Sequence, residues 1–172
     1  MKKDKILDYI HKIFAEYPSH LKNGVVDEDQ LTRCHDATIL FSGKTWTELM
    51  DVDLYHSEDA IICINNLAFS YYIAAYLKLF IEKYYEADAL VDTILNKLTP
   101  PVRNGEPRPA WIEKNIDFFS YEKKAVISFT LQYLCIKYND QNAEKALSIY
   151  WGQYLNESLL LNNIQGSKNN SK

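Results

Sequence analysis

Several short runs of side chains have the residue types needed to bind a metal or to exchange protons. Cys34, His35 and Asp36 follow one another, but adjacent residues on a helix point about 100° apart, so the three cannot all face one ion. His56 and Asp59 are three residues apart and could share a helix face, as a ligand pair or as a base with its orienting carboxylate. A surface cap or a salt bridge explains these residues more simply, and we favour that interpretation for both sets.

Two further sets lack the partners that chemistry would need. Glu82 and Glu86 are four residues apart, but a carboxylate-bridged metal bundle also requires Glu-x-x-His motifs on partner helices, and the sequence contains none. Cys135 lies between Leu134 and Ile136, so we expect a small core residue and not a nucleophile. The chain also lacks the G-x-G-x-x-G, G-x-x-x-x-G-K-[ST] and G-x-S-x-G motifs, which argues against nucleotide cradles and the hydrolase elbow. We therefore predict no catalytic residue, no metal ligand and no cofactor.

The segment 99–117 is the most irregular part of the sequence. It contains Gly105, four of the five prolines and two of the three arginines. Long loops inside compact domains are often functional. The side chains that could grip an anion or a carboxylate-bearing partner are Arg103, Arg108, Trp111 and Lys114. A purely structural, solvated loop remains the simpler interpretation.

Tyrosine is unusually frequent, with 13 residues in the chain. Five of them fall on one predicted helix: Tyr71, Tyr72, Tyr76, Tyr84 and Tyr85. Core aromatics whose hydroxyls reach the surface explain most of these residues. Tyrosine and tryptophan also predominate at binding hot spots, because they offer a large rigid area with a polar group. We therefore add Tyr71 and Tyr85 to the four residues of the segment 99–117 as the candidate binding surface.

Composition restricts the elements that can position these residues. Glycine and proline together number 10 of 172 residues, about half the usual share. A β-sandwich or barrel needs frequent turns built from such residues, so few, long elements are expected. Asp and Glu number 23 against 19 Lys and Arg, a net charge of −4. An acidic body repels nucleic acids and anionic lipids and suits a basic protein partner, although mild acidity is also simply common.

The cysteines and the N-terminus predict a reduced, cytoplasmic location. Cys34, Cys63 and Cys135 form an odd, widely spaced set that matches no disulfide framework and no zinc site. Charged residues interrupt the N-terminal segment, which lacks the apolar stretch of a signal peptide. The uncharged run 60–77 is long enough to raise the question of a membrane, but its polar side chains favour a buried core helix.

Apolar periodicity predicts a single all-α domain over residues 1–163, a compact bundle of about six or seven helices. The expected helical segments are 4–17, 28–41, short pieces within 46–58, 66–85, 87–98, 120–138 and 142–155. The helix 66–85 is apolar nearly all round and is expected to be central. Asn65 or Asn66 would cap it, and Ser120 would cap the helix 120–138. The polar tail 164–172 is predicted to be disordered.

With these elements in place, the sequence resembles an uncharacterised family of small bacterial proteins, a domain of unknown function. The matching motifs are FSGKTWTEL from Phe41, LAFSYYIAAYL from Leu67, FSYEKKAV from Phe119 and ALSIYW from Ala146. In the family pattern a proline follows the paired tyrosines, where this chain has Ala74. The resemblance covers about residues 30–152, implies an all-α bacterial cytosolic protein and carries no catalytic residues across.

Three classes of function remain open. The first is a non-enzymatic protein-binding module, with a toxin-neutralising immunity protein as its concrete form and another, basic protein as its partner. The second is an enzyme or small-ligand binder that uses His56, Asp59 or the segment 99–117. The third is a structural homo-oligomer. Neither nucleic acid nor membrane is an expected partner, and the oligomeric state is left open.

Overall fold

The computed structural model describes residues 1–19, 21, 24–158 and 160 of the chain. This part forms eight α-helices, three short 3-10 helices and one two-stranded hairpin. The elements are α1 (Lys3–Ile13), η2 (Glu28–Gln30), α2 (His35–Phe41), η3 (Trp46–Glu48), α3 (Asp51–Tyr55), α4 (Glu58–Cys63), α5 (Asn66–Leu98), β1 (Val102–Arg103), β2 (Glu106–Pro107), α6 (Pro109–Asn115), α7 (Tyr121–Tyr138), α8 (Gln141–Ile149) and η4 (Trp151–Tyr154). The predicted all-α fold is confirmed. The predicted disordered tail 164–172 lies outside the described residues.

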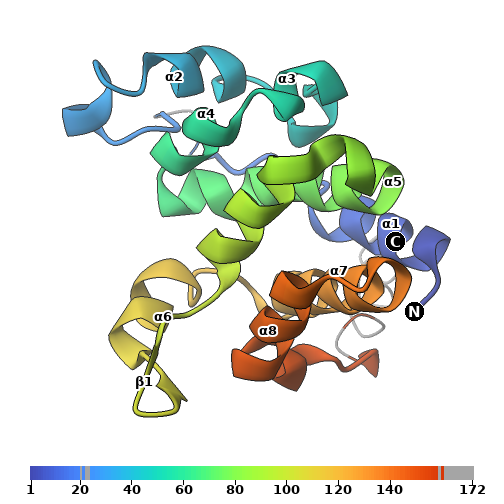
Figure 1. Ribbon diagram of the computed structural model, residues 1–172. Helices are drawn as coiled ribbons and strands as arrows, with labels where there is room; N and C mark the ends of the chain where they lie inside the picture. The colour runs from blue at the N-terminus through green and yellow to red at the C-terminus, as the bar shows by residue number, and fades with distance from the viewer. Residues whose placement is uncertain (20, 22–23, 159, 161–172) are drawn as a thin grey trace, which may run out of the picture.

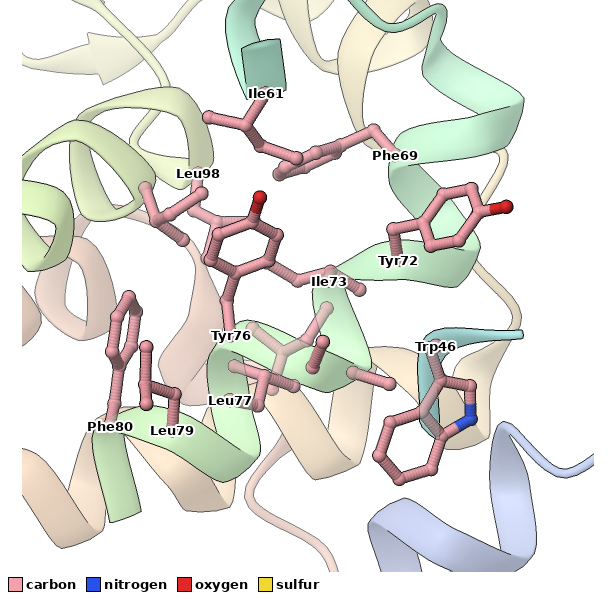
Figure 2. Close-up of a cluster of buried hydrophobic side chains, with 14 of the residues drawn as sticks. Trp46, Ile61, Phe69, Tyr72, Ile73, Tyr76, Leu77, Leu79, Phe80 and Leu98 are labelled. Atoms are coloured by element: carbon pink, nitrogen blue, oxygen red, sulfur yellow. The ribbon is translucent and has the colours of Figure 1, made fainter. Parts of the chain in front are cut away.

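Helix α5 is the centre of the molecule, as its apolar sequence predicts. It begins at the predicted cap Asn65, whose side-chain oxygen accepts the backbone N–H of Ala68 (2.9 Å). It runs between one layer formed by α2, α3 and α4 and another formed by α1, α7 and α8 (Figure 1). Every residue from Ala68 to Leu77 is buried. Figure 2 shows how side chains from successive turns of α5 meet Trp46, Ile61 and each other in this core.

The tyrosines of α5 bury their hydroxyl groups together with their rings. The Tyr72 hydroxyl donates to the carbonyl oxygens of Phe41 (2.6 Å) and Lys44 (2.8 Å), where α2 ends. The Tyr76 hydroxyl shares a hydrogen bond of 2.8 Å with Ser57, just before α4. Burial raises the pKa of both phenols, so they remain neutral donors and acceptors. The short helices are therefore tied to α5 by polar contacts inside the core.

Helix α5 is longer and less regular than predicted. Sequence periodicity indicates separate helices over 66–85 and 87–98, whereas the structure has one element with non-helical backbone at Lys83 and Asp88. The predicted boundary therefore marks a kink. Asp88 has φ 31° and ψ −117°, which lies far from helical geometry and outside the left-handed region that aspartate tolerates. The kink lets the C-terminal part of α5 turn toward α8.

Three other predicted helices are shorter in the structure. The segment predicted as 4–17 is α1, which ends at Ile13. The segment predicted as 28–41 contains a 3-10 turn, and α2 begins only at His35. The segment predicted as 142–155 leaves the α conformation at Tyr150 and continues as the 3-10 helix η4. This change of direction brings the indole N–H of Trp151 to the carbonyl oxygen at the end of α5, Leu98 (2.8 Å).

Most of the segment 99–117 belongs to the hairpin β1–β2 and to helix α6, so its interpretation as one long irregular loop is wrong. Asn104 and Gly105 both have positive φ and form the turn between β1 and β2, as an Asn-Gly pair favours in a tight hairpin. Pro109 then occupies the first turn of α6, a position that proline tolerates because its missing N–H would be unpaired there anyway. The hairpin projects away from the helical body (Figure 1).

The structure also corrects the prediction from the cysteines. Cys34, which precedes α2, forms a disulfide with Cys63, the last residue of α4. Their separation of 29 residues hides the pairing from the sequence, because only the packing of α2 against α4 brings the two backbones together. Disulfides are rare in the reducing cytosol. Cysteine usage therefore no longer supports the cytoplasmic location, which stays a prediction.

Trp151→Ala should lower the free energy of unfolding by about 3–5 kcal/mol, because it removes a fully buried indole and leaves the Leu98 carbonyl without its donor. Chemical denaturation of the purified variant measures this loss. Ile136→Ala is the matched control, because Ile136 lies on the surface and is 77% exposed. Its loss should stay within about 0.5 kcal/mol. Equal losses in the two variants would contradict the core position of Trp151.

Reduction of the Cys34–Cys63 disulfide should lower the free energy of unfolding by about 3–4 kcal/mol, since it releases a closed loop with a sequence separation of 29. Urea unfolding with and without a reducing agent measures the change. The Cys135→Ser variant should show the same response, because Cys135 is the free cysteine. Finding three reactive thiols in the oxidised, denatured protein would refute the pairing.

Candidate binding surface

The structure separates the six predicted surface residues into three groups. Arg103, Arg108 and Lys114 are exposed on the hairpin and α6, and Trp111 is half-buried against the core. Tyr85 lies on α5 near the kink and is 80% exposed. The sixth residue, Tyr71, is buried. The predicted residues therefore do not form one surface.

Tyr71 was wrongly predicted as a surface residue. It is 1% exposed, and its ring contacts Tyr17 edge-on at 5.4 Å between centroids. Its hydroxyl oxygen accepts the backbone N–H of Trp46 at 3.4 Å. Burial raises the pKa of Tyr71. The neighbouring Tyr72 is buried as well, because α5 is enclosed on all sides at this level. In the sequence, no apolar stripe distinguishes the exposed Tyr85 from the buried Tyr71 and Tyr72.

The two arginines of the predicted surface line a shallow cavity of about 490 Å³ within the hairpin. Its other walls are Asn104, Glu106, Pro107, Pro109 and Ala110. Trp111 and Lys114, in contrast, lie outside this cavity. Lys114 instead lines a groove of about 390 Å³ on the side of α6 that meets α5. The two arginines and Lys114 therefore line different cavities.

Tyr85 belongs to a cluster of four tyrosines that sequence reasoning did not assemble. We call Tyr84, Tyr85, Tyr133 and Tyr138 the tyrosine cluster. Tyr84 stacks on Tyr138 with ring centroids 4.1 Å apart and an interplanar angle of 6°. Tyr85 meets both rings edge-on at 5.4 Å, and Tyr133 meets Tyr138 at 6.1 Å. The cluster joins the kink of α5 to the C-terminal end of α7.

Acidic groups hold and surround the tyrosine cluster. The Tyr84 hydroxyl donates to a carboxylate oxygen of Asp140 (2.6 Å), and the other oxygen of Asp140 caps α8. Burial raises the pKa of Tyr84, and the hydrogen bond to Asp140 and the charge of Asp92 raise it further. Asp92 also accepts a hydrogen bond from the amide of Asn142 (2.7 Å). The cluster thus presents the exposed ring of Tyr85 beside three half-buried tyrosines, with carboxylates nearby.

The other side chains that could act in catalysis or bind a metal are not brought together. His56 and Asp59 are both exposed, at the end of α3 and within α4 respectively. His35 and Asp36 are exposed, while the cysteine before them is in the disulfide. Glu86 accepts a hydrogen bond from Tyr55 (2.9 Å), and Glu82 pairs with Lys78. Among the described residues, no three His, Cys, Asp or Glu side chains gather as a metal site would require.

Cys135 is half-buried beside the tyrosine cluster, and its thiol donates to the carbonyl oxygen of Asp140 (3.7 Å). Burial raises the pKa of this thiol to about 11, and the nearby carboxylates of Asp140 and Glu144 act in the same direction. Because the thiolate is the nucleophile, a raised pKa makes Cys135 unreactive near neutral pH. This agrees with the expectation that it is a packing residue.

Alkylation of the native protein by iodoacetamide tests this environment. The rate should rise with pH toward an inflection near the Cys135 pKa of about 11, because a raised pKa leaves the thiol protonated at lower pH. The labelled site is identified by mass spectrometry. The unfolded protein, in which the neighbouring carboxylates are dispersed, should show an inflection near about 8.5. The same inflection in native and unfolded protein would contradict the prediction.

No helix in the described part of the chain is both long and apolar enough to cross a lipid bilayer. The uncharged run 60–77 is divided between α4 and α5, and much of it is core. Its expected role as buried helix is therefore confirmed for the α5 part.

Comparison with known proteins adds no relative from which a role could be carried over. No family model, curated protein or solved structure matches this chain. The resemblance to an uncharacterised bacterial family remains a prediction, and the function has to be argued from the surface itself.

Proposed function

We propose that this chain is a non-enzymatic protein-binding module and that the tyrosine cluster is its contact surface. The observation that carries the proposal is the position of Tyr85, which is 80% exposed yet lies edge-on against the stacked rings of Tyr84 and Tyr138. A ring that is already fixed loses little side-chain entropy when a partner covers it. Rigid, exposed tyrosines of this kind are typical anchors of protein interfaces.

The charge beside the cluster favours a basic partner. Asp92, Asp140 and Glu144 lie close enough to shift the pKa values of Tyr84 or Cys135 upward, so their negative charge is felt at this surface. Cationic side chains of a partner could pair with the exposed carboxylates of Asp92 and Glu144 and stack on the exposed ring of Tyr85. The net charge of −4 acts in the same direction over longer distances.

A toxin-neutralising immunity protein is the concrete form of this proposal. Such a role needs a small, stable body, one rigid anchoring surface and no catalytic machinery. The enclosed α5 core supplies the first requirement and the tyrosine cluster the second. An enzyme that uses His56 and Asp59 has less support, because neither residue lines the two cavities described above.

Tyr85→Ala should weaken partner binding by about 30-fold or more, which is the loss of about 2 kcal/mol typical of a hot spot. The immobilised protein is first used to capture a protein from cells of its source organism. The captured protein is then purified and titrated against the wild type and the variant by calorimetry. The fold should be unaffected, because Tyr85 is exposed and forms no described hydrogen bond.

Tyr121→Ala is the matched control for this titration. Tyr121 is another exposed tyrosine of the chain, at the opposite end of α7 from Tyr133 and Tyr138. Its removal should change the affinity by less than about threefold. Absence of any specific protein partner at micromolar concentration, or equal effects of the two variants, would overturn the proposal. The immunity role requires in addition that co-expression with a toxin encoded nearby restores growth for the wild type but not for Tyr85→Ala.

A further inference from the structure

A second charged site lies where the ends of α2, α4, α5 and α6 meet. These ends enclose the groove of about 390 Å³ mentioned above. Its cationic side chains are Arg33, Lys97 and Lys114, and its acidic residue is Asp27. With three positive charges and one negative charge, the lining of the groove has a net charge of +2. A cationic groove is unexpected in a chain whose carboxylates outnumber its cations.

The three cations of the groove, like several others of the chain, have no carboxylate partner among the described residues. Five lysines elsewhere on the chain have carboxylate partners: Lys5 with Glu157, Lys12 with Asp8, Lys78 with Glu82, Lys83 with Asp51, and Lys124 with Asp117. Arg33, Lys97 and Lys114 form no salt bridge with any residue that the structure describes. Their charges are therefore available to a ligand in the groove.

Lys97 is the cation for which the missing partner matters most. It is half-buried near the end of α5, and its Nζ lies 4.8 Å from the ring centroid of Phe69. Burial lowers its pKa, and no carboxylate compensates. A partly desolvated ammonium group is unfavourable without an anion or hydrogen-bond acceptors. An anionic ligand in the groove would supply both.

The walls of the groove are fastened to each other without any ligand. The disulfide joins Cys34, the neighbour of Arg33, to Cys63 at the end of α4. The side-chain amide of Asn66 donates to the backbone carbonyl of Lys114 (2.8 Å), which ties the start of α5 to α6. A preformed groove avoids part of the cost of ordering a site when a ligand binds.

We propose that this groove binds a phosphate group, either as inorganic phosphate or as the phosphate monoester of a small molecule. A phosphate group carries about 1.5 to 2 negative charges at neutral pH, which is close in size to the net charge of +2 around the groove. A guanidinium can bind two phosphate oxygens as a fork, while ammonium groups act as point charges. Lys114 is the residue of the predicted surface that contributes to this site.

Calorimetric titration with inorganic phosphate at constant ionic strength tests the site. We expect saturable binding that Lys97→Met weakens by about tenfold or more, since a charge-assisted hydrogen bond is lost. Methionine keeps an apolar stem against Phe69. Lys114→Met should also weaken binding. Because Lys114 is exposed, this variant tests the site even if Lys97→Met proves unstable.

Lys145→Met is the matched control, because Lys145 is an exposed lysine of α8 that does not line the groove. The phosphate affinity of Lys145→Met should equal that of the wild type. The phosphate affinity of Tyr85→Ala should also be unchanged, so this test is independent of the proposed protein partner. Parallel titration with glycerol 3-phosphate distinguishes the two kinds of ligand. Tighter binding of inorganic phosphate identifies the free ion as the ligand, and tighter binding of glycerol 3-phosphate identifies a phosphate monoester; either result supports the site. Acetate binding as tightly as phosphate, no saturation at millimolar phosphate, or equal effects of all lysine variants would overturn the proposal.

Discussion

The structure depends on one constraint: a helix enclosed on all sides must satisfy every polar group that it buries. Helix α5 buries the rings of Tyr71, Tyr72 and Tyr76, and each hydroxyl meets a group in another element. The partners are the carbonyl of Phe41, the backbone N–H of Trp46 and the hydroxyl of Ser57. An unpaired buried group would cost about 1–3 kcal/mol. The tyrosines therefore determine where the ends of the short helices must lie.

The two buried tryptophans, Trp46 and Trp151, follow the same rule as side chains that donate to the helix ends. Trp46 donates its indole N–H to the carbonyl of Phe14, and Trp151 donates to that of Leu98. Both acceptors lie at the ends of helices, where carbonyl groups lack partners within the helix. Core packing and hydrogen bonding thus agree on a single arrangement, which is expected to favour one native structure. Short helices such as α3 would be marginal alone.

Rigidity of this core bears on both proposed sites, which lie in different parts of the molecule. The tyrosine cluster forms where the kinked α5 meets the ends of α7 and α8, and Asp140 fixes it by bonding Tyr84 and capping α8. The groove forms where other helix ends meet, and a disulfide fixes its walls. In each case the participating side chains come from elements that are distant in the sequence. A surface of aromatic and acidic groups is suited to binding a protein partner, while a groove whose cations lack carboxylate partners is suited to binding a small anion.

Sequence reasoning succeeded where one local signal sufficed. The apolar stripe of 66–85 predicts the central helix, and the capping roles of Asn65 and Ser120 are confirmed. It failed for the segment 99–117, although the Asn104-Gly105 pair is a local hairpin signal that could have revealed the turn. It also failed for Tyr71, because the neighbouring tyrosines of α5 look alike in a helix that is apolar nearly all round.

The amino-acid sequence by itself determined an all-α body, its central helix and the absence of the common nucleotide and hydrolase motifs, since these follow from periodicity, caps and local spacing. Tertiary structure alone decided that Cys34 bonds Cys63, that Tyr85 faces outward while Tyr71 does not, and that Lys97 shares a groove with Arg33 and Lys114. The physical reason is that each of these results depends on which helices pack together. Contacts between distant segments leave no periodic trace in the chain.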